Sequence, residues 1–173
     1  MNVNGWVNGL AFSPSANLLS YVTHDCEVNF VDISKLGTAE GQKIKPETEK
    51  IMHNGNPHLH CIFVDDSTLV ASGYDKVPYV YKKEVNWSMK TMLDPGMKNF
   101  RKAKISGNSF VDKKVYFNPD IKLGANVELK ETDTMHSNYV NCLKPFAQSS
   151  GKPLILCSSD VNGHINYWDV QKV

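Results

Sequence analysis

The sequence predicts an all-β fold in which short antiparallel strands recur in repeated units. Helical periodicity is nearly absent from the 173 residues. Short runs rich in Val, Ile, Tyr and Phe alternate instead with turns of Gly, Pro, Asn, Asp and Ser. The order strand, turn, strand, turn, strand occurs three times along the chain. With 41% hydrophobic and 21% charged residues, the composition is that of an ordinary globular protein.

The first repeat unit occupies the N-terminal part of the chain. Its predicted strands cover residues 6–12, 17–22 and 28–33. Pro14 fixes φ in the turn between the first two strands. A looser segment at residues 35–49 then leads to a short apolar run at residues 50–52, where the unit ends.

Two further units follow the same order. The predicted strands of the second unit are residues 60–64, 68–72, 78–81 and 87–92. Pro78 suits a strand start or an edge strand because it cannot donate a ladder hydrogen bond. The predicted strands of the third unit are residues 139–146, 154–158 and 164–169. Repeats of roughly 40–50 residues with about four short strands are typical of β-propeller blades.

A short polar residue recurs six positions before the end of the third strand in each unit. These residues are Asp25, Asp75 and Asn162, and the last unit ends its strand in Trp168. Asp and Asn suit such turns because they hydrogen-bond their own backbone and tolerate left-handed angles. We therefore predict that these residues build the structural turns of three blades. Closed propellers usually have four to eight blades, so three blades form a partial one.

Several motifs follow one another in an order that is specific. Residues 167–170 (Tyr-Trp-Asp-Val) close a strand downstream of Met135-His136, which resembles a WD repeat. Residues 11–15 (Ala-Phe-Ser-Pro-Ser) and the run from Leu69 to Asp75 precede them. Over about residues 5–170, this series of motifs resembles the C-terminal half of proteins in the family of actin-related protein 2/3 complex subunit 1. The resemblance implies a seven-bladed WD-repeat propeller, of which this chain carries about three blades.

The resemblance also implies a function. Members of the family are implied to be non-catalytic scaffold subunits of a complex that nucleates branched actin filaments. The expected partners are then the other subunits of that complex, the actin filament and nucleation-promoting factors, in the cytoplasm at the actin cytoskeleton. The alternative is a generic WD-repeat adaptor in another cytosolic protein assembly, because one propeller fold serves many functions.

A basic insertion separates the second and third units. We divide the chain into two blades at residues 5–94, an insertion at residues 95–130 that forms a protruding loop or short helix, and a final blade at residues 131–173. The insertion carries eight Lys and Arg against three Asp and Glu, hence +5, and the rest of the chain sums to −4. The net charge of +1 therefore hides a basic segment on a mildly acidic body.

Part of the insertion has a pattern that suits partner contact. Residues 97–105 place apolar and basic side chains near one face at helical spacing. The resemblance implies that this insertion touches the mother actin filament; because actin is acidic, basic side chains would steer association and apolar ones would anchor it. The alternative is a solvated loop without a partner. The candidate contact residues are Met97, Phe100, Arg101, Lys102, Lys104 and Ile105.

The cysteines and histidines allow a metal site without favouring one. The four cysteines, at positions 26, 61, 142 and 157, form no C-x-x-C pair and are expected to be buried, reduced thiols. On a regular strand, His58 and His60 would share one face while Cys61 points the other way. Zinc requires four converging ligands, or three and a water. We therefore expect no metal or cofactor, and a metal-dependent enzyme built on His53, His58 and His60 is the alternative.

Motifs of catalysis are missing from the sequence. It contains no Gly-rich phosphate loop, no G-x-S-x-G elbow and no H-E-x-x-H pair. Asp65-Asp66 lies in a predicted turn with little burial, and His24-Asp25 is explained as a structural turn. The basic and aromatic run from Lys113 to Phe117 is short for a nucleic-acid platform. No apolar run approaches the roughly 20 residues of a membrane helix. We therefore expect no enzyme, no nucleic-acid binding and no membrane binding.

Overall fold

Three antiparallel sheets make up the part of the chain that the computed structural model describes, residues 5–34, 46–94, 134–149 and 152–171. Sheet A contains β1 (Val7–Phe12), β2 (Leu18–Thr23), β3 (Glu27–Asp32) and β4 (Thr48–Met52). Sheet B contains β5 (His58–Asp65), β6 (Thr68–Gly73), β7 (Tyr79–Lys83) and β8 (Trp87–Met92). Sheet C contains β9 (Val140–Ser149), β10 (Lys152–Asp160) and β11 (Ile165–Asp169).

Each sheet is a meander whose strands pair in chain order. The described residues include no helix, and hence none that is long and apolar enough to cross a membrane. The predicted all-β fold of about three WD-repeat-type propeller blades is confirmed, with four strands in sheets A and B and three in sheet C. The insertion at residues 95–130, with its six candidate contact residues, lies outside the described residues.

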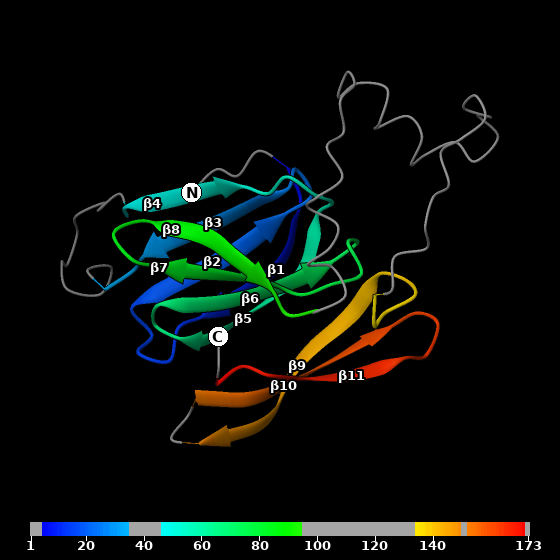
Figure 1. Ribbon diagram of the computed structural model, residues 1–173. Coiled ribbons are helices and arrows are strands. Elements are labelled where there is room, and N and C mark those ends of the chain that lie inside the picture. Colours follow the sequence, from blue (N-terminus) through cyan, green and yellow to red (C-terminus); the bar gives the residue numbers. More distant parts are fainter. Residues whose placement is uncertain (1–4, 35–45, 95–133, 150–151, 172–173) are drawn as a thin grey trace.

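Sheet B lies between sheets A and C, as Figure 1 shows. The first strand of sheet B, β5, lies beside the first strands of the other two sheets, β1 and β9. Two hydrogen bonds join them: Asn8 Nδ2 donates to the carbonyl of His58 at 2.9 Å, and His60 Nε2 lies 2.8 Å from the carbonyl oxygen of Asn141. Because both of its faces are covered, sheet B has a central strand, β6, that is buried along its whole length.

The interface between sheets A and B is an apolar core built from alternate residues of facing strands. Val22, Val28 and Phe30 of sheet A pack against Cys61 and Phe63 of sheet B, together with further buried residues. The outer strand of sheet B adds Trp87, whose ring stacks on Phe30 with centroids 3.8 Å apart. Burying side chains of this size stabilises a fold by roughly 1.5–3 kcal/mol each. The interface therefore holds the two blades in a fixed arrangement.

A second apolar core joins sheets B and C. Val70 and Val80 of sheet B contact Leu143, Leu156 and Trp168 of sheet C in this core. Val70 and Val80 point away from the first core because successive strand residues face opposite sides. Because successive residues of sheet B enter cores on opposite sides, the strands of the second sequence unit are nearly continuous apolar runs and do not alternate between apolar and polar residues.

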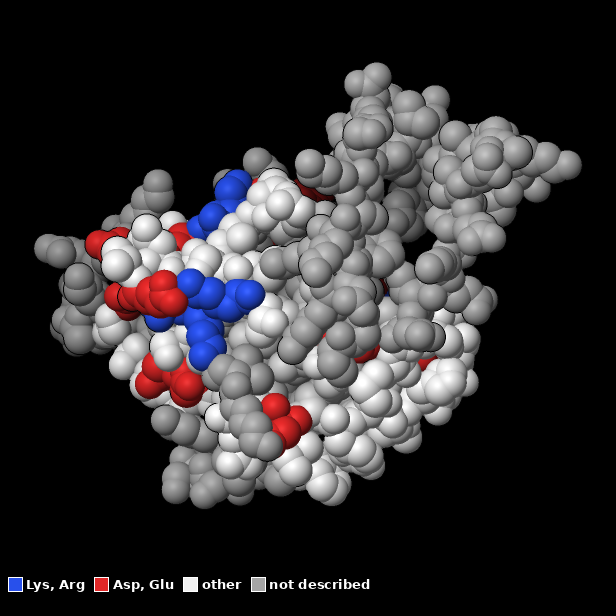
Figure 2. All heavy atoms as spheres, in the orientation of Figure 1, with Lys and Arg blue, Asp and Glu red and all other residues white. Residues whose placement is uncertain are grey.

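Three ion pairs join lysines to glutamates on the described surface. Figure 2 shows acidic and basic side chains next to one another on one face of the molecule. The ion pairs are Lys50–Glu27 at 2.8 Å, Lys83–Glu49 at 3.2 Å and Lys90–Glu84 at 2.9 Å. Exposed pairs of this kind contribute roughly 0–1 kcal/mol each, so the cores rather than the charges stabilise the sheets.

The expectation that His58 and His60 share a face is wrong. The pairing of β5 with β6 shifts register between these two residues, which marks a β-bulge. An extra residue in one strand reverses the alternation of side chains beyond it. His58 therefore points to the buried hydroxyl of Tyr81 in sheet B, whereas His60 points to the backbone of Asn141 in sheet C.

Candidate functional site

The three predicted turn residues occupy matching places, between the second and third strands of their sheets. The residue after each of them has a positive φ: Cys26 at 65°, Lys76 at 62° and Gly163 at 90°. A positive φ is uncommon outside glycine, so its recurrence at one position shows that the three turns are built alike. The spacing of six residues found in the sequence therefore coincides with a repeated backbone conformation.

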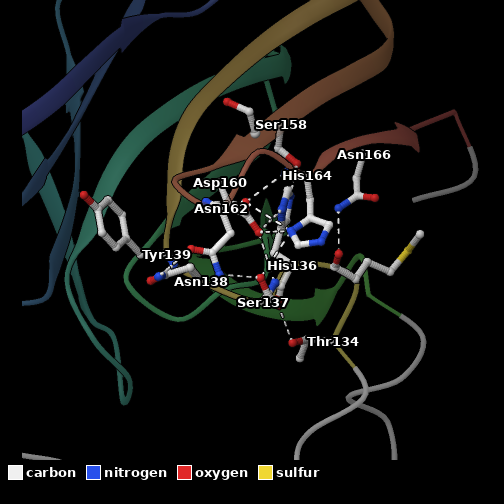
Figure 3. A network of polar contacts seen from close by, with 12 residues as sticks. Thr134, His136, Ser137, Asn138, Tyr139, Ser158, Asp160, Asn162, His164 and Asn166 are labelled. Carbon is white, nitrogen blue, oxygen red and sulfur yellow. Dashed lines mark hydrogen bonds and ion pairs between the residues drawn. The ribbon is translucent and has the colours of Figure 1, made fainter.

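In sheet C, a chain of polar contacts lies next to the turn that contains Asn162 (Figure 3). Trp168 Nε1 donates to Ser158 Oγ at 2.6 Å, and His136 Nε2 lies 2.6 Å from the same oxygen. His136 Nδ1 lies 3.3 Å from Asp160 Oδ2. Because Nδ1 faces a carboxylate it carries the ring proton, which leaves Nε2 to accept from the Ser158 hydroxyl. Four side chains from three segments are thus tied together inside the blade.

Asp160 supplies the carboxylate of this network, two residues before Asn162. Its oxygens accept the backbone N–H groups of Ser137 at 3.0 Å, Asn162 at 2.9 Å and His164 at 3.0 Å. Burial alone would raise the pKa of Asp160, but the hydrogen bonds from His164, Ser137 and Asn162 outweigh it and hold the pKa well below its usual range. Asn162 lies in the turn itself, and its Nδ2 donates to Ser137 Oγ at 2.8 Å.

Contacts connect Ser158 to His136 and His136 to Asp160, which is the order of side chains in a Ser-His-Asp catalytic triad. Their surroundings do not suit that chemistry, because a nucleophilic oxygen must reach a substrate. Ser158 is only 1% exposed, and its oxygen already accepts a hydrogen bond from Trp168. Burial also lowers the pKa of His136, despite the opposing effect of Asp160. The arrangement therefore stiffens the blade and is closed to substrates.

Sheet B contains a second network built from different side chains. His53 Nε2 contacts Asp75 Oδ2 at 2.8 Å, and His53 Nδ1 lies 3.0 Å from the Tyr81 hydroxyl. That hydroxyl also lies 2.8 Å from His58 Nε2. Tyr81 pairs with Leu69 as Trp168 pairs with Leu156, so the two aromatic residues hold equivalent positions. Sequence reasoning identified Asp75 but missed His53, His58 and Tyr81 as its network.

Burial sets the protonation states in this second network. It lowers the pKa of His58 to about 3, with the neighbouring His53 acting in the same direction. Burial alone would raise the pKa of Asp75, but hydrogen bonds from His53 and the Asn56 N–H hold it below its usual value. Burial also raises the pKa of Tyr81. A neutral His58 and an ionised Asp75 are therefore the stable forms near pH 7.

The alternative of a zinc site is not supported in the described part of the chain, where no group of three or more His, Cys, Asp or Glu residues could hold a metal ion. His53 and His58 both contact the Tyr81 hydroxyl, and His60 points elsewhere. Burial raises the pKa of Cys61 to about 12, so its thiol is not a ready metal ligand at neutral pH. All four cysteines lie in the described ranges, and no two of them form a disulfide.

The remaining candidate residues have structural contacts. Asp65 Oδ1 accepts the Ser67 N–H at 2.7 Å, and Asp66 Oδ1 accepts the Ser15 N–H at 3.0 Å, which ties sheet B to the first turn of sheet A. The His24 ring lies 5.4 Å from the Trp6 ring, centroid to centroid. The two carboxylates are thus used to fix turns.

The meander sheets, their repeated turns and the buried His–Asp networks define a class of protein, namely partial propellers of WD-repeat-type blades. No family model matches the chain. Among curated proteins, it is 27% identical over 176 residues to actin-related protein 2/3 complex subunit 1 of Schizosaccharomyces pombe, covering 95% of this chain and 45% of that protein. The resemblance seen in the sequence is thereby confirmed.

Relatives from other organisms give the same result. Subunit 1A-B of the complex from Xenopus laevis is 26% identical over 171 residues, covering 95% of this chain and 41% of the relative. Subunit 1B from Arabidopsis thaliana is 24% identical over 177 residues, covering 97% and 43%. The chain therefore spans less than half the length of the curated relatives it matches.

Proposed function

We propose that this chain is a non-catalytic scaffold subunit of an actin-related protein 2/3 complex, at the cytoplasmic actin cytoskeleton. The observation that carries the proposal is the similarity over nearly the whole chain to subunit 1 of that complex in a yeast, an animal and a plant. The fold agrees with this role, because stacked blades present a large, rigid surface on which several partners can be held.

The mechanism we propose is positional. Two apolar cores fix sheets A, B and C relative to one another, and the buried networks at Asp75 and Asp160 fix their turns. Such a body holds the other subunits of the complex in one geometry for the nucleation of a branched filament. It contributes no chemistry of its own to that process.

The basic insertion is the proposed contact with the mother actin filament. Its charge of +5 contrasts with the −4 of the rest of the chain and suits an acidic partner. Arg101, Lys102 and Lys104 would steer the approach, and Met97, Phe100 and Ile105 would supply the desolvated anchor. Nucleation-promoting factors are further proposed partners of the assembled complex.

A filament-branching assay tests this proposal. The complex is assembled with the chain carrying Phe100→Ala and Arg101→Ala, and branch density on preformed filaments is measured. Because a buried aromatic and an arginine commonly dominate an interface, we expect branching to fall about tenfold. The matched control carries Lys113→Ala and Lys114→Ala, which lie in the same insertion and should change it little. Unchanged branching in the first variant would contradict the proposed contact.

A further inference from the structure

A hydrogen bond joins the chain on the two sides of the basic insertion. Asp94 lies just after β8 at the end of sheet B, and Met135 lies just before sheet C. Asp94 Oδ2 accepts the backbone N–H of Met135 at 2.7 Å, although the two residues are 41 positions apart in the chain. The insertion at residues 95–130 lies between them. The chain therefore leaves sheet B and returns to sheet C at neighbouring points.

The end of sheet B fixes the position of Asp94, which is only 1% exposed. The neighbouring Leu93 donates its N–H to the carbonyl of Pro78 at 3.0 Å and packs against the apolar core between sheets B and C. A buried carboxylate requires hydrogen-bond donors, because burial removes its water. The Met135 N–H is such a donor, and hydrogen bonds to ionised groups are among the stronger ones in proteins.

Sheet C holds Met135 from the other side. The Met135 carbonyl accepts a hydrogen bond from Asn166 Nδ2 of β11 at 3.1 Å. Thr134 Oγ1 donates to the carbonyl of His136 at 2.6 Å (Figure 3), and the His136 ring is buried in the network of Asp160. The backbone of Met135 thus bridges two sheets, because its N–H is bound from sheet B and its carbonyl from sheet C.

The connection between sheets A and B shows what this bridge replaces. There, the network histidine, His53, directly follows the last residue of β4. His136 contacts the carboxylate of the next network, but the insertion separates it from β8. The hydrogen bond between Asp94 and Met135 therefore joins the chain at the place where the first connection needs only a peptide bond.

We propose that Asp94 is a positioning residue of the insertion: its carboxylate pins Met135 to the end of sheet B and fixes where the insertion leaves and re-enters the blades. The hydrogen bond itself rests on described residues alone. Its consequence for filament binding rests on the proposed function, in which the insertion contacts the filament. With both ends of the insertion fixed in advance, binding has fewer groups to order and loses less free energy in doing so.

Hydrogen exchange on the assembled complex tests the hydrogen bond. Asp94→Ala removes the acceptor, so exchange of the Met135 amide, resolved by fragmentation of its peptide, should quicken at least about tenfold. Asp94→Asn keeps a side-chain oxygen in the same place and should restore most of the protection. The control is Asp169→Ala, which removes a carboxylate that accepts the Gln171 N–H at an exposed position. Unchanged exchange in Asp94→Ala would overturn the proposal.

Co-sedimentation of the same complexes with actin filaments tests the positioning role. Asp94→Ala should weaken filament binding roughly threefold, because binding must then also fix the ends of the insertion. Asp94→Asn should restore it. If Asp94 acts through the contact residues, Asp94→Ala should add no further loss to the combined Phe100→Ala and Arg101→Ala variant. An additive loss would overturn the positioning role, since Asp94 would then act elsewhere in the molecule.

The positioning role and the filament contact fail in different ways. If the Phe100→Ala and Arg101→Ala variant binds filaments normally, the filament contact is wrong, and exchange of the Met135 amide still decides whether Asp94 joins the two ends. If that variant binds weakly while Asp94→Ala quickens exchange and binds normally, the contact stands and the positioning role is refuted. Unaltered exchange in β5 and β6 shows that the sheets of each variant are folded.

Discussion

At the scale of single residues, equivalent positions in two sheets perform the same task with different chemistry. Trp168 ties sheet C through an indole N–H to Ser158, whereas Tyr81 ties sheet B through a hydroxyl shared by His53 and His58. The spacing rule predicted the turn residues, but it did not predict which residue supplies the carboxylate in sheet C. That carboxylate is Asp160, which ends β10 just before the turn. Only the hydrogen bonds of the folded chain show that Asp160, and not Asn162, accepts the backbone N–H groups around the turn.

The hydrogen bond of Trp168 should be measurable by substitution. Trp168→Phe removes the indole donor and leaves the buried Ser158 hydroxyl without it, so we expect a loss of roughly 1–3 kcal/mol in the free energy of unfolding. Urea unfolding measures it. The control is Tyr167→Phe, an exposed neighbour on the same strand, which should change stability by less than about 0.5 kcal/mol. Equal losses in both variants would contradict a specific role for the indole N–H.

Burial of His58 predicts how stability depends on pH. The folded chain holds the pKa of His58 at about 3, against an ordinary value of 6.5. Between these values the unfolded chain binds a proton that the folded chain does not, so stability falls as the pH falls from 6.5 towards 3. From pH 7 to pH 5 this residue should cost about 2 kcal/mol.

The variant His58→Gln isolates this effect. Its unfolding free energy should change less between pH 7 and pH 5 than that of the unaltered chain, at equal protein concentration. Val85→Ala, at an exposed residue between β7 and β8, is the control and should keep the original pH dependence. If His58→Gln retained the full pH dependence, the buried neutral state assigned to His58 would be refuted.

At the scale of strands and sheets, sequence patterns predicted most of the fold. Apolar alternation and turn residues located strands close to those observed, for example 68–72 against Thr68–Gly73 for β6. The bulge between His58 and His60 could not be predicted, because nothing in the local sequence signals an inserted residue. It matters for the site, since it sends one histidine into sheet B and the other towards sheet C.

The contact between sheets A and B depends on a glycine in β1. A Cβ atom at Gly9 would lie 2.6 Å from the carbonyl oxygen of Leu59 in β5, so no larger residue fits without moving one strand. We expect Gly9→Ala to lower the unfolding free energy by roughly 1–3 kcal/mol. Hydrogen exchange should quicken in β1 and β5 while β10 and β11 keep their protection.

Gly163→Ala provides the comparison for that experiment. A Cβ there meets no atom within 4 Å, and only its positive φ makes alanine unfavourable. Its effect should therefore be confined to the turn between β10 and β11. Faster exchange throughout all three sheets in Gly9→Ala would show that the substitution unfolds the molecule rather than separating two blades.

At the scale of the whole molecule, the three sheets and their shared cores account for a rigid body, and the comparisons relate it to one assembly. The charge separation between the insertion and the blades was visible in the sequence because it needs only counting. Which insertion residues contact a partner depends on the partner surface, so Met97 to Ile105 remain a prediction.

Quantitative mass spectrometry of the proteins that co-purify with the tagged chain from its own cells tests the central claim most directly. If the chain is a scaffold subunit of an actin-related protein 2/3 complex, the actin-related subunits should be recovered in a fixed ratio to it after stringent washing. An untagged strain gives the background. Recovery of a different set of proteins in fixed ratio, with the actin-related subunits at background, would contradict the claim and identify the chain as an adaptor in another assembly.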